Sequence, residues 1–224
     1  MLQHPENRST APELGGVVFR QYRVVGFIKP PHPLGNMRGF YIGRFQPYHN
    51  GHHSMVERIS EEVDELVLGI GSADDSHTTH DPFTAGERIM MITKAVAEYD
   101  LTTYVVPLED INRNAVWVSH VESMCPDFDV AYSNNPLVVR LFEEAGIEVR
   151  QSPMFDRDRL EGSEIRQRMI DDESWRDRVP ASVVEVIEEI HGIKRLQHVS
   201  DSDSLERYAA TGESLPESLD DLDD

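Results

Sequence analysis

The sequence predicts an α/β fold: a Rossmann-like, doubly wound parallel sheet of about five strands, followed by C-terminal helices. Along the chain, short apolar runs alternate with segments in which apolar residues recur every three or four positions. Such an alternation of strands and helices favours a parallel sheet that is covered on both faces. The 224 residues, 39% of them hydrophobic, suffice for one well-formed domain and are thin for two.

The expected elements follow one another in a regular order. Strands are expected at residues 39–43, 65–71, 103–108, 129–132 and 147–150, and helices at residues 53–63, 84–99, 115–124, 136–145, 163–170 and 181–190. In the second helix, Ile89, Ile92 and Val96 have the spacing of one helix face. Thr84 is a suitable N-cap for that helix, and Glu87, three residues later, completes a capping box.

The two ends of the chain differ from this central region. Residues 1–36 are expected to be a disordered N-terminal extension, since residues 1–37 hold five of the 13 prolines and show no sustained period. Residues 198–224 contain nine carboxylates and one arginine, a net charge of −8, and are expected to form a disordered acidic tail. The folded domain is therefore expected at residues 37–197.

The composition restricts the partners and the compartment. With 41 acidic and 21 basic side chains the formal net charge is −20, which argues against binding nucleic acid through a basic surface. Only three of the basic residues are lysines, a pattern typical of proteins kept soluble at high ionic strength; a merely acidic protein is the alternative. The single cysteine, Cys125, excludes an intramolecular disulfide, and the apolar runs are too short to cross a membrane. We therefore expect a soluble, cytoplasmic protein without a membrane partner.

The most informative segment is Gly-Arg-Phe-Gln-Pro-Tyr-His-Asn-Gly-His at residues 43–52, where the first strand ends and the first helix begins. Ligands of open parallel sheets bind at such strand ends, beside helix N-termini. His49 and His52 would lie on one side of the first helical turn, and the Arg44 guanidinium suits phosphate oxygens. Gly51 leaves room for a phosphate near backbone N–H groups. The alternatives are ordinary surface histidines, or a metal-binding pair for which no third ligand is evident.

A second phosphate-binding element is expected at residues 162–166, Gly-Ser-Glu-Ile-Arg, at the start of a late helix. Free backbone N–H groups and the positive end of the helix dipole can hold a β- or γ-phosphate there. Arg166 would project from the first turn towards this phosphate. The alternatives are that Ser163 is a simple N-cap and that Arg166 forms a surface ion pair.

Segment 43–52 resembles the phosphate-binding signature of the His-x-Gly-His nucleotidyltransferase superfamily. Further segments are similar to the archaeal nicotinamide-nucleotide adenylyltransferases, and the resemblance spans residues 37 to about 197; these segments are residues 37–44, 70–73, 81–88, 134–138, 157–159 and 162–166. The resemblance implies that the adenylyl group of ATP is transferred to the 5′-phosphate of nicotinamide mononucleotide, giving NAD and pyrophosphate, by in-line attack without a covalent intermediate. It also implies Mg²⁺ bridging the ATP phosphates and a homo-oligomer, in many relatives a hexamer.

The resemblance further implies roles for individual residues. The catalytic residues would be His49, His52, Arg44 and Arg166, and the residues that contact ATP would be Phe45, Gly51, Ser72, His80 and Ser163. Trp117 would stack on the nicotinamide ring, and Asn114 would bind its carboxamide. A cationic pyridinium lies favourably against the face of an indole. No side chain is expected to bind the metal directly.

His80 departs from the family pattern. Some similar archaeal enzymes carry an arginine at this position, so that a permanent charge is replaced by one that titrates near neutrality. His77 or Arg88 could compensate for the lost charge. Two alternative functions stay open at this point: a related adenylyl- or cytidylyltransferase that acts on another phosphate, and a non-catalytic nucleotide-sensing module.

Overall fold

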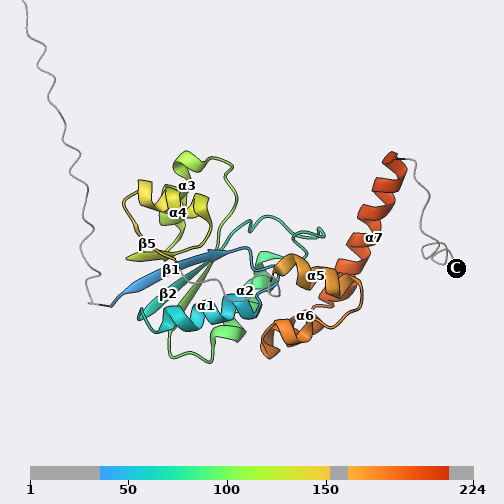
Figure 1. Ribbon diagram of the computed structural model, residues 1–224, viewed down its shortest axis with the longest axis horizontal. Coiled ribbons are helices and arrows are strands. Elements are labelled where there is room, and N and C mark those ends of the chain that lie inside the picture. The colour runs from blue at the N-terminus through green and yellow to red at the C-terminus, as the bar shows by residue number, and fades with distance from the viewer. Residues whose placement is uncertain (1–35, 152–160, 212–224) are drawn as a thin grey trace, which may run out of the picture.

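Five strands form one parallel sheet in the order β3-β2-β1-β4-β5 (Figure 1). The computed structural model describes residues 36–151 and 161–211, with side chains described as far as residue 203. In chain order the strands are Arg38–Gly43 (β1), Glu65–Ile70 (β2), Thr102–Pro107 (β3), Val130–Tyr132 (β4) and Glu148–Arg150 (β5). This confirms the predicted doubly wound sheet.

Helices cover both faces of the sheet and continue beyond it in a C-terminal group (Figure 1). Helices α1 and α2 pack on one face and α3 and α4 on the other, while α6 packs on α2. The helices are Asn50–Ser60 (α1), Ala85–Val96 (α2), Asn114–Met124 (α3), Pro136–Glu144 (α4), Gly162–Ile170 (α5), Ala181–Glu189 (α6) and Gly192–Thr211 (α7). None of these described helices combines the length and the apolar composition needed to cross a membrane.

The central strand β2 shows why its sequence is apolar at consecutive positions. Leu66, Leu68 and Ile70 belong to the core beneath α1 and α2, whereas Val67 belongs to the core beneath α3 and α4. All four side chains are fully buried. Because successive side chains of a strand point to opposite faces, a strand covered on both sides needs an uninterrupted apolar run.

The predicted strand bounds agree with the structure to within one residue, and most helix bounds do as well. Two helices differ more: α1 spans Asn50–Ser60 instead of residues 53–63, and α2 ends at Val96 instead of residue 99. The earlier start of α1 has a local cause, because the His49 side chain takes the place of the usual capping oxygen. The capping box of α2 is confirmed: Glu87 N–H donates to Thr84 Oγ1, and Thr84 N–H donates to Glu87 Oε2.

Helix α7 differs from the expected disordered tail at residues 198–224. It continues through residue 198 to Thr211. Leu196 is fully buried, and Gln197 Nε2 donates to the carbonyls of Met169 and Ile170 at the end of α5. The acidic composition predicted a solvated segment, but docking of these first turns provides a base from which the helix extends. Residues 212–224, like residues 1–35 of the expected N-terminal extension, lie outside the described residues.

The strand order creates a crevice at the carboxyl end of the sheet. Strands β2 and β3 follow β1 on one side of it, whereas β4 and β5 lie on the other side of β1. The connections that follow β1 and β4 therefore leave towards opposite faces. In open α/β sheets this switch point is where ligands bind, and residues 44–49 leave β1 there.

Candidate active site

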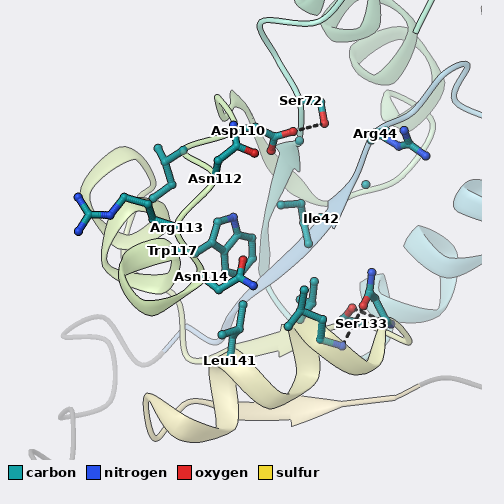
Figure 2. Close-up of a pocket in the computed structure, with 16 residues that line it drawn as sticks. Ile42, Arg44, Ser72, Asp110, Asn112, Arg113, Asn114, Trp117, Ser133 and Leu141 are labelled. Atoms are coloured by element: carbon teal, nitrogen blue, oxygen red, sulfur yellow. Dashed lines mark hydrogen bonds between the residues drawn. The ribbon is translucent and has the colours of Figure 1, made fainter. Parts of the chain in front are cut away.

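Two cavities open at the carboxyl ends of the strands, and Arg44 lines both of them. The first, called here the phosphate cavity, has a volume of about 450 Å³ and lies between residues 44–52, His80 and the start of α5. The second, called the tryptophan cavity, has a volume of about 550 Å³ and lies between the ends of β1 and β2 and the starts of α3 and α4 (Figure 2). A ligand that fills both cavities would pass Arg44.

Arg88 holds the backbone turns that follow β1 and β2. Its fully buried guanidinium donates to the carbonyls of Arg44 (2.9 Å), Gly71 (3.0 Å) and Ser72 (2.9 Å). Phe45 and Ser72 have φ values of 54° and 47°, in the left-handed region that residues other than glycine adopt at a cost. Burial lowers the pKa of Arg88, and nearby carboxylates oppose this effect. Arg88 thus stabilises the turns from inside and does not face the phosphate cavity.

The two histidines of the His-x-Gly-His segment cap helix α1. Gly51 N–H donates to His49 Nδ1 (3.1 Å), and His49 N–H donates to His52 Nδ1 (3.2 Å). Together they form a capping box in which imidazole nitrogens replace the usual side-chain oxygens. A neutral imidazole whose Nδ1 accepts a hydrogen bond carries its proton on Nε2. The helix cap therefore selects the tautomer in which each ring offers an Nε2–H donor.

The surroundings keep both histidines neutral. Their rings stack with centroids 3.6 Å apart, and His52 also packs edge-on against Phe45 (4.7 Å) and near Tyr48 (5.6 Å). Burial lowers the pKa of His49 to about 4. Burial likewise lowers the pKa of His52 well below its ordinary value of 6.5, and the neighbouring His49 adds to this effect. At neutral pH the phosphate cavity thus contains two uncharged hydrogen-bond donors.

Arg44, His80 and Asp81 form a cluster at the rim of the phosphate cavity. Arg44 Nη1 lies 2.7 Å from His80 Nδ1, and His80 Nδ1 also lies 2.8 Å from Asp81 Oδ2. One imidazole nitrogen cannot accept from the guanidinium and donate to the carboxylate at the same time. Asp81 is 6% exposed, and its Oδ1 has no hydrogen-bond partner within the described part of the chain. The cluster therefore holds the Arg44 guanidinium, and only part of the hydrogen-bonding capacity of the cluster is used.

Arg166 lies on α5 at the opposite wall of the phosphate cavity. Its Nε donates to the carbonyl of Thr79 (3.0 Å), and its Nη1 donates to the carbonyl of Gln46 (2.7 Å). The Gln46 side chain in turn exchanges two hydrogen bonds with the backbone of Phe83. Burial lowers the pKa of Arg166, while the nearby Asp81 opposes this. The surface ion pair considered as an alternative is wrong, because Arg166 is 8% exposed and bonds to carbonyls.

The start of α5 forms the floor between these groups. The N-cap is Glu161 and not Ser163, and no side chain forms a cap hydrogen bond there. Gly162 and Ser163 line the phosphate cavity. A Cβ atom at Gly162 would lie 3.1 Å from the carbonyl oxygen of Gln46 and 3.3 Å from Arg166 Nη1, so glycine permits the close approach of α5.

The tryptophan cavity combines an indole with polar groups. Figure 2 shows Trp117 and Asn114, both from α3, facing Ile42 and Leu141. The Trp117 ring packs edge-on against Phe142 with centroids 5.4 Å apart, which orients it while its other side lines the cavity. Asp110 Oδ2 accepts a hydrogen bond of 2.6 Å from Ser72 Oγ at the far wall. Trp117 is thus only partly a core residue.

Most of the predicted site residues meet in these two cavities. Those in the phosphate cavity are Arg44, Phe45, His49, His52, His80, Ser163 and Arg166, and those in the tryptophan cavity are Arg44, Ser72, Asn114 and Trp117. Gly51 lines neither cavity, since its N–H binds His49. His77 contacts Arg195 on α7, so it does not replace a cavity charge at position 80. Residues 157–159 lie outside the described residues.

Sequence reasoning missed three residues that shape the cavities: Gln46, Asp81 and Asp110. Gln46 and Asp81 stand inside the motif segments. The role of Gln46 depends on Phe83 and Arg166, which are 37 and 120 residues away. Asp81 contacts its neighbour His80, and its Oδ1 lies 3.9 Å from Nη1 of Arg44, 37 residues away. Asp110 stands three residues after the end of β3, at the carboxyl edge of the sheet, which was a usable signal. Across the described ranges, no three His, Cys, Asp or Glu side chains are grouped so as to hold a metal ion.

Comparisons with known proteins identify the relatives of this chain. Residues 40–168 match the cytidylyltransferase-like family model. The chain is 68% identical over 168 residues to a nicotinamide-nucleotide adenylyltransferase of Halorubrum lacusprofundi, covering 75% of this chain and 96% of that protein. It is 66% identical over 167 residues to the corresponding Halobacterium salinarum protein (75% and 94% covered) and 59% identical over 167 residues to that of Methanosarcina barkeri (75% and 96%). The halophilic hosts of the first two fit the acidic, lysine-poor composition.

A solved structure agrees on the fold. The bifunctional NMN adenylyltransferase/ADP ribose pyrophosphatase from Francisella tularensis, crystallised with AMP and a manganese ion, superposes with a TM-score of 0.62 at 16% identity. The match covers 81% of this chain and 57% of that longer chain. At this identity the likeness concerns the fold alone, whereas the sequence relatives are matched over nearly their whole length. The chain belongs to the nicotinamide-nucleotide adenylyltransferase family.

Proposed function

We propose that this chain transfers the adenylyl group of ATP to the 5′-phosphate of nicotinamide mononucleotide, giving NAD and pyrophosphate. The observation that carries the proposal is the position of Arg44, which lines both the phosphate cavity and the tryptophan cavity. A guanidinium at that junction can bind phosphate oxygens of both substrates. The family relationship supports the same reaction.

The phosphate cavity is assigned to the triphosphate of ATP. The Nε2–H groups of His49 and His52 would donate to oxygens of the α- and β-phosphates, and Arg44 and Arg166 would bind the phosphate chain. Because the histidines are neutral and their tautomers are set by the cap of α1, these donors are oriented before the substrate arrives. Donors that need no reorientation are the most effective at stabilising charge that develops during reaction.

The tryptophan cavity is assigned to nicotinamide mononucleotide. The pyridinium would stack on the free side of Trp117, and Asn114 at the start of α3 would bind the carboxamide. The 5′-phosphate would then point towards Arg44 at the junction. This arrangement explains how an acidic chain could bind two anions, because donors line the phosphate cavity and Arg44 extends this set to the junction with the tryptophan cavity.

The reaction needs no nucleophilic side chain, since the attacking phosphate is already ionised. Its oxygen forms a bond to the α-phosphorus of ATP as the bond from that phosphorus to the bridging oxygen of pyrophosphate breaks. Alignment of the two substrates can lower the barrier by roughly 7–11 kcal/mol. Mg²⁺ would be bound as part of the MgATP substrate, where it would neutralise part of the phosphate charge. The cavity's own side chains are chiefly donors, which suits phosphate oxygens better than a bare cation.

We also propose that the protein is a cytoplasmic homo-oligomer without nucleic-acid or membrane partners. The net charge of −20 supports the absence of nucleic-acid binding, because phosphate backbones repel such a surface. Light scattering coupled to gel filtration in concentrated KCl would determine the number of subunits.

Product analysis tests the proposed reaction. The purified chain, MgATP and nicotinamide mononucleotide are mixed in concentrated KCl, and NAD is measured with a coupled dehydrogenase. We expect equal amounts of NAD and pyrophosphate. Parallel reactions contain phosphopantetheine, FMN or nicotinic acid mononucleotide as acceptor, or CTP in place of ATP. Binding of ATP without product from any acceptor would contradict the proposal and favour a nucleotide sensor.

A further inference from the structure

Helix α7 contacts the loop that forms the rim of the phosphate cavity. Thr79 Oγ1 donates a hydrogen bond of 3.0 Å to Asp203 Oδ2, which joins residues 124 positions apart. Near the start of the same helix, Arg195 donates to Glu87 Oε1 (2.8 Å) and lies 3.2 Å from His77 Nε2. Helix α7 thus contacts the loop between β2 and α2 at two places, His77 and Thr79, through residues eight positions apart, and the second contact comes from the acidic segment.

Thr79 forms hydrogen bonds through both its side chain and its carbonyl. Its hydroxyl binds Asp203 on α7, and its carbonyl accepts the hydrogen bond from Arg166 Nε on α5. Arg166 also donates to the carbonyl of Gln46, so its guanidinium bridges the loop and the turn after β1. The position of this guanidinium in the phosphate cavity therefore depends on where the Thr79 carbonyl is held.

The residue after Thr79 extends the effect to the other wall. His80 lines the phosphate cavity and contacts Arg44 Nη1 at 2.7 Å. A displacement of Thr79 would thus change the positions of the Arg166 and His80 side chains. Through His80 it would also change the position of Arg44. None of these contacts involves the tryptophan cavity except through Arg44.

We propose that Asp203 is a positioning residue for the triphosphate half of the active site, acting through Thr79 on Arg166 and His80. This inference rests on the assignment of the phosphate cavity to ATP. It gives the start of the acidic segment a function beyond solubility. It also predicts a specific signature: the loss of the Asp203 contact weakens ATP binding and leaves binding of the acceptor nucleotide nearly unchanged.

Four variants separate this role from a merely structural one. Asp203→Ala removes the acceptor, Thr79→Val removes the donor but keeps the carbonyl that binds Arg166, and Asp203→Asn keeps an oxygen that can accept from Thr79. Asp201→Ala is the matched control, because Asp201 lies on the same helix, is similarly half-buried and is also a carboxylate. Thermal unfolding of every variant is measured in the same KCl buffer.

The readouts are KM for ATP, KM for nicotinamide mononucleotide, kcat, and the calorimetric Kd for ATP alone. We expect Asp203→Ala and Thr79→Val each to raise the KM and Kd for ATP by about three- to tenfold, the size of one lost hydrogen bond. A fifth variant that combines Asp203→Ala with Thr79→Val should show no larger effect than either change alone, because both changes remove the same contact. Asp203→Asn should restore most of the affinity, and Asp201→Ala should match the parent chain.

The inference is overturned if Asp203→Ala binds ATP like the parent chain, if both substrates weaken equally, or if Asp201→Ala has the same effect. It is also overturned if the effects of Asp203→Ala and Thr79→Val add. The Kd for ATP tests the inference even if no NAD is formed, so that failure of the reaction and failure of the positioning role are distinguishable.

Discussion

The substitution His49→Asn separates the two functions of this residue, helix capping and donation to phosphate. Asparagine is among the best N-cap residues, so its side-chain oxygen can accept from Gly51 N–H in place of His49 Nδ1. The shorter side chain does not reproduce the Nε2–H donor that faces the phosphate cavity. The variant should therefore fold, but it should lack one donor to the triphosphate.

The expected loss of activity follows from the role of that donor. Removal of one preorganised donor in a comparable setting lowers kcat by about 100- to 1,000-fold. The free energy of unfolding at neutral pH should change by only about 1 kcal/mol, because asparagine replaces the helix cap and only the ring stacking on His52 is lost. Steady-state NAD formation and urea denaturation in the same KCl buffer measure the two effects.

The same variant has a signature in the pH dependence of stability. Burial lowers the pKa of His49 to about 4 in the folded state, against an ordinary value of 6.5. As the pH falls below about 6.5, the unfolded chain binds a proton at this position and the folded chain does not, so that stability is lost until about pH 4. Between about pH 7.5 and about pH 5 this single group accounts for roughly 2 kcal/mol of lost stability. His49→Asn should lose less stability over this range by that amount.

Two results would refute the reasoning. A variant with near-parent kcat would show that His49 Nε2 does not act on the phosphates. Parallel curves of stability against pH for the parent chain and the variant would show that His49 is not buried as a neutral ring. His52→Asn is unsuitable as a first test, because its ring fills space between Phe45 and Tyr48.

Three further substitutions test the remaining parts of the site. Arg44→Ala should lower kcat by at least 100-fold. Because the side chain is half exposed, the unfolding free energy should change by less than about 1 kcal/mol. Steady-state kinetics and urea denaturation measure the two effects, and parent-like turnover would remove Arg44 from the mechanism. Arg88→Met should destabilise the fold by about 3–6 kcal/mol, since three buried carbonyls at strained turns lose their donor; a loss below about 1 kcal/mol in the same denaturation assay would contradict this role. Trp117→Ala should raise the KM for nicotinamide mononucleotide by about tenfold and leave that for ATP within about twofold, and an equal rise in both KM values would show that Trp117 is chiefly a core residue.

The secondary structure and the location of the site could be predicted because they depend on short-range patterns. Apolar runs indicated the strands that are covered on both faces, and three- to four-residue spacing indicated the helices. The capping box of Thr84 and Glu87 forms between residues three apart. The His-x-Gly-His segment likewise forms within one helical turn, from His49 to His52. Local contacts of this kind are decided by the order of residues alone.

The roles of Arg88, Asp81 and Asp203 could not be predicted, because each depends on groups brought together by the sheet order and by helix packing. The sequence suggested Arg88 as a charge that could compensate at position 80, whereas in the structure the turns after β1 and β2 surround it with carbonyls. Asp203 reads as part of a solvated acidic tail until α7 docks and reaches Thr79. The sequence by itself thus determined the strands, the helices that cover the sheet, the family signature and most of the residues that meet at the strand ends. Only the tertiary structure decided which charged groups are buried and what they bind, because burial and long-range hydrogen bonds exist only once separate elements have packed.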